Sequence, residues 1–231
     1  MKLSHIQAIG IKQVKDTMKN KPVLIQFVMF PIMCIILTLS TSDMELPHNM
    51  FVYLFSSMYT AMAPLLVVST LISEDKEKGC LRMLRMSNVT PLEYLLGIGA
   101  YVFLLCFLGV CLMGVLGKLS FSSYMTFLAL HSSALLISLL LGALIGILSA
   151  NQTAASGLSV PAMLVCSFIP MLSMFNDSIR HYGQFLFSQQ VYEQIQGLGT
   201  ALSMKSVIII TANFFALLII YLAVYRKHPL L

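Results

Sequence analysis

The sequence contains few charged residues. Aspartate, glutamate, lysine and arginine make up 10% of the 231 residues, whereas hydrophobic residues make up 58%, and the mean hydropathy is +0.87. Soluble domains carry about 25% charged residues. The composition therefore excludes an ordinary soluble protein and predicts an all-α integral membrane protein.

The motifs of several chemistries are also missing. Gly117-Lys118 is followed by Leu119, and no G-x-x-x-x-G-K-[ST] occurs, so the chain lacks the loop that binds ATP phosphates. The hydrophobic segments hold no carboxylate pair, no His-Glu-x-x-His and no Ser/His dyad at helical spacing, which disfavours an intramembrane enzyme. Without a carboxylate there, a proton-coupled transporter is also disfavoured. We expect no catalytic site, no metal site and no cofactor bound by this chain.

The five cysteines form no CxxC pair. Four of them lie in hydrophobic segments, where no oxidising compartment reaches them, and Cys80 lies in a polar segment. We expect reduced thiols that serve as small apolar side chains.

Six hydrophobic runs are long enough to cross a bilayer, which takes about 20 residues. The N-terminal segment contains lysines instead of a short apolar core with a cleavage site, so we expect no removable signal peptide. The sequence predicts one six-helix transmembrane domain over 22–231, with spans at 22–40, 51–73, 94–117, 124–149, 155–175 and 206–225.

Basic residues are distributed unevenly between the two sides of the predicted bundle. Of the 14 lysines and arginines, all but Lys118, Arg180 and Lys205 fall on the side of the N-terminus. The positive-inside rule then places both termini in the cytoplasm. We expect a multi-pass protein of the cell membrane, of a bacterial type. The net charge of +5 follows from basic inner loops and requires no nucleic-acid partner.

Residues 1–21 alternate apolar and basic side chains. This pattern favours an amphipathic helix that lies at the inner membrane surface and contacts the lipid bilayer. An ordinary basic flank that only fixes topology is the alternative. The residues of the pattern are Leu3, Ile6, Ile9, Val14 and Met18 on the apolar side and Lys2, Lys12, Lys15 and Lys19 on the basic side.

The densest run of charge follows the second span, in residues 74–93, which we name the coupling elbow. Gly79 disfavours helix and predicts a break before a short helix at 80–86. If residues 78–85 are helical, Lys78, Arg82 and Arg85 form one basic stripe at i, i+4 and i+7. Thr90-Pro91-Leu92-Glu93 then predicts a capped helix start, with Thr90 as N-cap and Glu93 closing a capping box.

These residues resemble a known pattern. Glu74, Glu77, Gly79, Leu81 and Leu84 are similar to the Glu-x-x-Glu-x-Gly-x-hydrophobic-x-x-Leu sequence that type-2 (type V exporter-like) ABC transporter permeases carry between their second and third helices. Cys80 departs from that family, which often has Thr or Ser there. The six spans, the N-terminal amphipathic helix and a long outer segment before the last span are similar to the family plan.

The resemblance implies that the elbow docks into a separate ABC ATP-binding subunit, which holds ATP and Mg, and that the permease works with a second permease copy, identical or related. Leu81 and Leu84 would be the apolar anchors of this docking, and the charged side chains would face complementary charges. The implied ATPase-coupling residues are Glu74, Asp75, Lys76, Glu77, Lys78, Gly79, Leu81, Arg82, Leu84 and Arg85.

Small residues recur every four positions in the fourth span. Ser138, Gly142, Gly146 and Ala150 predict a stripe on which a neighbouring helix packs closely. The neighbour could belong to a second copy, but we favour a helix of the same chain.

Polar residues inside the spans are candidates for a transport pathway: Ser57, Thr60, His131 and Asn213. Each has a structural alternative, because hydroxyls can bond to the preceding helical turn and a neutral histidine or amide can hold helices together. Residues 176–204 are too polar to span and too apolar for an open loop. They predict outer, partly re-entrant helices that either gate an exit or shield the bundle.

Three functions compete. The first is the membrane subunit of an ATP-driven ABC exporter for a hydrophobic or amphipathic drug, peptide or lipid, a cargo that the 16 methionines and scattered hydroxyls suit. The second is an intramembrane enzyme. The third is a non-transporting scaffold or immunity protein, which would have no ATPase partner.

Overall fold

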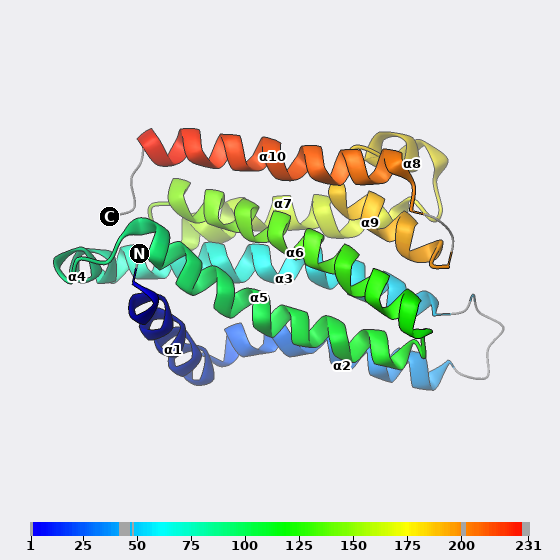
Figure 1. The fold of residues 1–231 in the computed structure, drawn as a ribbon, viewed down its shortest axis with the longest axis horizontal. Helices are drawn as coiled ribbons and strands as arrows, with labels where there is room; N and C mark the ends of the chain where they lie inside the picture. The colour runs from blue at the N-terminus through cyan, green and yellow to red at the C-terminus, as the bar shows by residue number, and fades with distance from the viewer. Residues whose placement is uncertain (1, 42–46, 48, 200–201, 228–231) are drawn as a thin grey trace.

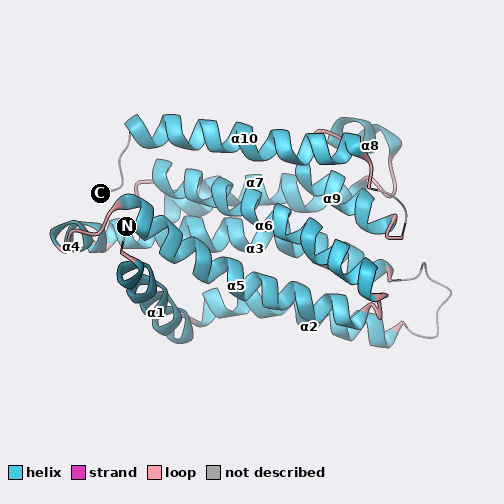
Figure 2. Ribbon diagram, viewed as in Figure 1, coloured by secondary structure: helices cyan, strands magenta, loops and turns pink. Residues whose placement is uncertain are grey.

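The computed structural model describes residues 2–41, 47, 49–199 and 202–227. These residues form ten helices and no strand (Figure 2). The predicted domain limits at residues 1 and 231, and residues 200–201 of the outer segment, lie outside the described part. The helices are α1 (Leu3–Lys19), α2 (Lys21–Ser40), α3 (Met50–Glu77), α4 (Cys80–Met86), α5 (Pro91–Leu116), α6 (Phe121–Leu148), α7 (Gln152–Leu172), α8 (Asp177–Gly183), α9 (Phe187–Gln196) and α10 (Met204–Lys227).

Six helices are long and apolar enough to cross a membrane: α2, α3, α5, α6, α7 and α10. They run side by side along the long axis of the molecule (Figure 1). This confirms the six predicted spans and the all-α class. The start of α2 and the end of α10 lie at the same end of the bundle, together with α1 and α4, whereas α8 and α9 lie at the opposite end (Figure 1).

Helix α3 occupies the centre and packs against α2, α5, α6, α7 and α9. Its polar side chains can be buried because they bond to their own helix. The Ser57 hydroxyl donates to the Leu54 carbonyl at 2.8 Å, and the Thr60 hydroxyl lies 3.1 Å from the Ser56 carbonyl. The buried hydroxyls therefore cost little, and α3 can present apolar and small residues to all its neighbours.

Close packing of α6 on α3 depends on two glycines. A Cβ atom at Gly142 would lie 2.6 Å from the Leu65 carbonyl oxygen, and one at Gly146 would lie 2.8 Å from the Ile72 Cβ. Ser138 is fully buried on the same helix. The neighbour of the predicted stripe is thus a helix of the same chain.

The stripe does not extend to Ala150, and this part of the prediction was wrong. Helix α6 ends at Leu148, and Ala150 is exposed in the short connection to α7. The Asn151 side chain there accepts a hydrogen bond from the Ala154 N–H and caps the next helix. The four-residue spacing continues in the sequence past Leu148, but such spacing places residues on one face only within a helix.

Candidate functional site: the charged end of helix α3

Helix α3 continues without a break to Glu77, so Glu74–Glu77 extend this span and are not a separate loop. Successive residues of an α-helix point about 100° apart. The side chains of Asp75, Lys76 and Glu77 therefore leave the helix in three directions, and each meets a different part of the protein.

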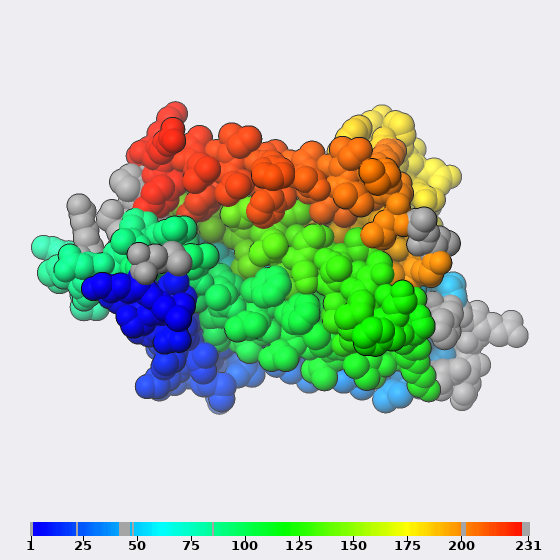
Figure 3. All heavy atoms as spheres, viewed as in Figure 1, coloured from blue at the N-terminus to red at the C-terminus, as the bar shows by residue number. Residues whose placement is uncertain are grey.

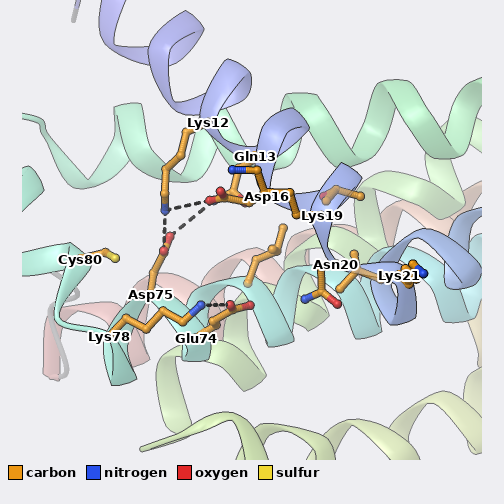
Figure 4. Close-up of a pocket in the computed structure, with 13 residues that line it drawn as sticks. Lys12, Gln13, Asp16, Lys19, Asn20, Lys21, Glu74, Asp75, Lys78 and Cys80 are labelled. Carbon is orange, nitrogen blue, oxygen red and sulfur yellow. Dashed lines mark hydrogen bonds and ion pairs between the residues drawn. The ribbon is translucent and has the colours of Figure 1, made fainter.

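Asp75 faces inward and is 5% exposed. Its carboxylate accepts hydrogen bonds from the Lys12 ammonium at 2.6 Å, the Tyr94 hydroxyl at 2.9 Å and the Gln13 amide at 3.4 Å. Figure 4 shows Lys12 of α1 reaching down to Asp75. A buried carboxylate is tolerable only when it is paired and hydrogen-bonded, and these donors from α1 and α5 meet that need. Asp75 joins three helices. The sequence had suggested that it faces a partner protein, but its carboxylate is used inside the chain.

Lys76 also faces the protein. Its ammonium donates to the carbonyls of Gly146 at 3.2 Å, Ser149 at 2.8 Å and Ile147. The last carbonyls of a helix lack partners within it and carry a partial negative charge. Lys76 thus caps the C-terminal end of α6 and, like Asp75, is used inside the protein.

Glu77 is exposed, and its carboxylate accepts a hydrogen bond from the Gln152 N–H at 3.1 Å. Gln152 is the first residue of α7, where a negative charge complements the free N–H groups and the helix dipole. The end of α3 is therefore in contact with α1, α5, α6 and α7 through three consecutive residues.

Glu74 and Lys78 form an exposed i,i+4 ion pair. The hydrogen bond from Lys78 to the Glu74 carboxylate raises the pKa of this ammonium. Gly79 follows with φ of +68°, a left-handed conformation that favours glycine, and so ends α3 and lets the chain turn into α4. The predicted break and the bounds of the short helix agree with these observations.

Helix α4 projects from the end of the bundle (Figures 1 and 3). Leu81 is 7% exposed, and Leu84 packs against the same core. The two leucines had been predicted as apolar anchors for a partner, but their packing inside the protein does not leave them free for that role. Arg82 is exposed, and Met83 and Met86 are 58% and 71% exposed. We name Arg82, Met83 and Met86 the α4 outer face. The side chain of Arg85 lies outside the described residues.

The exit from α4 is capped as the sequence predicts. The Thr90 hydroxyl accepts from the Glu93 N–H at 3.3 Å, and the Glu93 carboxylate accepts from the Thr90 N–H at 3.0 Å. Glu93 also accepts from the backbone N–H of Lys2 and lies 2.9 Å from Nδ1 of His5. The capping box therefore also holds the beginning of α1.

Four residues of this end escaped the sequence analysis as site residues: Lys12, Gln13, Glu93 and Tyr94. Their partners lie far away in the sequence, and only the capping position of Glu93 carried a local signal. The burial of Cys80 next to Asp75 raises the pKa of its thiol, which keeps it protonated.

The candidate pathway residues lie apart from this end. Ser57, Thr60 and His131 are at most 1% exposed inside the bundle. The His131 ring lies 4.2 Å from the Phe127 ring centroid, and neither ring nitrogen has a hydrogen-bond partner among the described residues. Asn213 donates to the carbonyls of Phe185 and Ile209, both at 2.9 Å. The structure does not bring these four residues together around one cavity of the described chain.

Six membrane-spanning helices, with a short helix projecting beyond the end of the second, define a polytopic helical membrane protein. The family model described as "ABC-2 family transporter protein" matches residues 3–225, and the chain belongs to this family. It is therefore an ABC transporter permease, the membrane component of a transporter whose family normally pairs with an ATP-binding subunit. No curated protein matches the sequence.

Proposed function

We propose that this chain is the permease subunit of an ATP-driven exporter in a cell membrane, with α1, α4 and the end of α10 on the cytoplasmic side. A separate subunit binds ATP and Mg and docks on the α4 outer face. Export of a hydrophobic or amphipathic drug, peptide or lipid follows from closure of the ATP sites. A second permease copy completes the transporter.

One observation carries the proposal: the end of α3 contacts four other helices beside the short helix α4. Asp75, Lys76 and Glu77 connect this end to α1 and α5, to α6 and to α7. A displacement of α4 is passed through Gly79 to α3 and through these contacts to the ends of four further helices. A solvated loop that only fixes topology has no need of such contacts.

The α4 outer face has the composition of a docking surface. Methionine and arginine are enriched in the cores of protein interfaces, and α4, which projects from the bundle (Figure 3), exposes Arg82 together with Met83 and Met86. The basic residues concentrated at this end support the cytoplasmic placement through the positive-inside rule. α1 supports it further, because it exposes apolar residues such as Leu3 and Met18 that suit a membrane surface.

The pathway belongs between two copies in this proposal. Ser57, Thr60 and His131 are packed inside one chain, so a route through them would require the bundle to open. The outward faces of α2, α7 and α10 expose many apolar side chains and can accommodate an apolar cargo or a second copy. Dimer formation is tested by the mass of the purified permease in nanodiscs, where a mass of one chain would contradict this part of the proposal.

The docking experiment substitutes Arg82→Glu and Met83→Glu together and measures co-purification with a co-expressed cognate ABC ATP-binding subunit. We expect at least a tenfold loss of the complex and of ATP turnover in proteoliposomes, since buried methionine and arginine anchors each contribute on the order of 2 kcal/mol. The control is Arg226→Glu, an exposed arginine at the same end on α10, which should leave both unchanged. An unaltered complex would contradict docking through α4, and a permease that co-purifies with no ATPase would favour a scaffold.

A further inference from the structure

A cavity of about 560 Å³ opens beside the charged end of α3, between α1, α2 and α3 (Figure 4). Its lining is polar and contains both signs of charge. The charged residues that line it are Lys12, Asp16, Lys19, Lys21, Glu74, Asp75 and Lys78. Figure 4 shows these side chains arriving from the two sides of the cavity, α1 and the start of α2 on one side and the end of α3 on the other.

The negative charges of the cavity are already paired. Lys12 contacts Asp75 at 2.6 Å and Asp16 at 3.9 Å, and Lys78 pairs with Glu74. Lys19 and Lys21 are exposed and have no ion pair among the described residues. Because Lys12 is shared by two carboxylates, the four lysines and three carboxylates of the lining leave a net charge of +1, carried on the side of Lys19 and Lys21, which attracts an anion.

The first turn of α2 strengthens this preference. α2 begins at Lys21, and its N-cap residue Asn20 makes no side-chain cap. The first N–H groups of a helix lack intrahelical partners and lie at the positive end of its dipole, where phosphate groups bind. Asn20, Lys21 and Val23 all line the cavity. Two lysines and the start of α2, where Pro22 provides no N–H, thus line the same space.

The helices that line the cavity also carry exposed apolar side chains. Met18, between the lining residues Thr17 and Lys19, is 69% exposed, and Ile25, one turn after Lys21, is 55% exposed. A free phosphate would leave these side chains in water. A phospholipid covers them with its acyl chains while its head group enters the cavity.

We propose that this cavity binds the phosphate head group of an anionic phospholipid and thereby fixes α1 and α2 against the end of α3. The inference uses the placement of α1 at a membrane surface, which belongs to the proposed function. Basic pockets between helices at a membrane surface are known to hold anionic head groups. Because the lipid would contact α1, α2 and the helix that carries Asp75, its binding stabilises the contacts of the coupling elbow.

The experiment titrates the purified full-length permease in neutral detergent with phosphatidylglycerol or phosphatidylcholine and counts bound lipids by native mass spectrometry. We expect phosphatidylglycerol to bind at least tenfold more tightly. The Lys19→Gln/Lys21→Gln variant should weaken phosphatidylglycerol binding about 30-fold, because each lysine contributes about fivefold to the affinity. The Lys19→Arg/Lys21→Arg variant keeps the charge and should retain binding.

The matched control is Lys15→Gln/Lys227→Gln, which removes two exposed lysines from the same end but not from the cavity. It should change phosphatidylglycerol binding less than threefold. Equal binding of the two lipids, or an equal loss in the control, would overturn the proposal. Inorganic phosphate that competes at the affinity of the lipid would also overturn it, in favour of a small-anion site.

The same preparations separate this proposal from the proposed function. Equal binding of the two lipids to an unmodified permease that still forms the ATPase complex refutes the lipid site alone. Lipid selectivity in a permease that binds no ATPase refutes the transport proposal and leaves the lipid site standing.

Discussion

The two ends of the helical bundle are held together by different chemistry. At the α4 end, charged groups join elements that are distant in the sequence: Lys12 to Asp75, Lys76 to Gly146 and His5 to Glu93 are 63, 70 and 88 residues apart. Around α8 and α9 at the opposite end, amides, hydroxyls and the exposed Arg180–Glu193 ion pair join residues closer in the sequence, whereas Asn49 and Gly117 at that end are joined across 68 residues. Gln194 to Ser206 is 12 residues apart and Gln190 to Ser206 is 16.

This difference shows that the two ends depend on the rest of the chain to different degrees. At the α8 and α9 end, the polar side chains of α9 and the start of α10 bond to each other, while α9 also packs against α3, α6 and α7. The α4 end exists only when α1, α3, α5, α6 and α7 are all in place, because each supplies one partner. The substitutions below test whether this contrast appears in stability.

The largest effect is expected from Asp75→Leu. It leaves the Lys12 ammonium and the buried Tyr94 hydroxyl without their partner, and breaking a buried ion pair costs about 3 kcal/mol. Unfolding of the purified protein in mixed micelles should show this loss, with α1 released to proteolysis. Asp16→Asn, which alters a carboxylate that is 53% exposed and 3.9 Å from the same lysine, should change stability by no more than about 0.5 kcal/mol. Equal effects of both substitutions would refute the role of Asp75.

A smaller loss is expected from Lys76→Met. The methionine preserves the apolar stem but leaves the last carbonyls of α6 without their donor, and a hydrogen bond to a charged group contributes about 1.5–3 kcal/mol. Amide hydrogen exchange should accelerate at the end of α6 and not at its start. Lys78→Met removes only an exposed pair, whose contribution is about 0–1 kcal/mol, and serves as the control. Unchanged exchange at residues 145–149 would contradict the capping role.

Gln190→Leu tests the other end. Gln190 is 2% exposed and bonds to the Gln184 carbonyl at 2.7 Å and the Ser206 hydroxyl at 2.6 Å. We expect a loss of about 1–2 kcal/mol, with faster hydrogen exchange confined to 184–206. The exposed Gln196 offers a control through Gln196→Leu. Faster exchange at α1 or α4 in the Gln190 variant would mean that the two ends are not independent.

The smallest effect is expected from Arg180→Ala. Its ion pair with Glu193, at 3.1 Å, joins α8 to α9 but is 59% exposed on the arginine side. Exposed pairs contribute about 0.2–1 kcal/mol and are weakened by salt. A double-mutant cycle with Glu193→Gln at low and high salt measures the coupling. If the coupling free energy between Arg180 and Glu193 exceeds that between Lys12 and Asp75, the α8 and α9 end depends more on its ion pair than the α4 end does, and the ranking of the two ends is reversed.

Local patterns in the sequence were sufficient for the helices themselves. Apolar length predicts the six spans because a bilayer demands it, Gly79 predicts the break because it adopts a left-handed conformation, and Thr90 with Glu93 predicts the cap because their partners are three residues apart. Each of these signals acts within a few residues. None requires knowledge of the tertiary structure.

The orientation of the elbow residues could not be predicted in this way. A helical pattern separates Leu81 and Leu84 from Arg82, but it does not say which face turns toward the bundle; Leu81 proved to be buried in it and Leu84 partly buried against it. Asp75 and Lys76 have the composition of a solvated loop. Their burial depends on Lys12, Tyr94 and the end of α6, which only the folded protein brings near.

The contacts of α1 also bear on how the protein is made. Helix α1 leaves the ribosome before its partners Asp75 and Glu93, which lie at the end of the second span and at the start of the third. During synthesis the contact of His5 with Glu93 therefore cannot form until the start of the third span has been made. Docking of α1 is thus completed only after the third span has begun, and a chain that stops before residue 93 would lack the partner of Lys2 and His5.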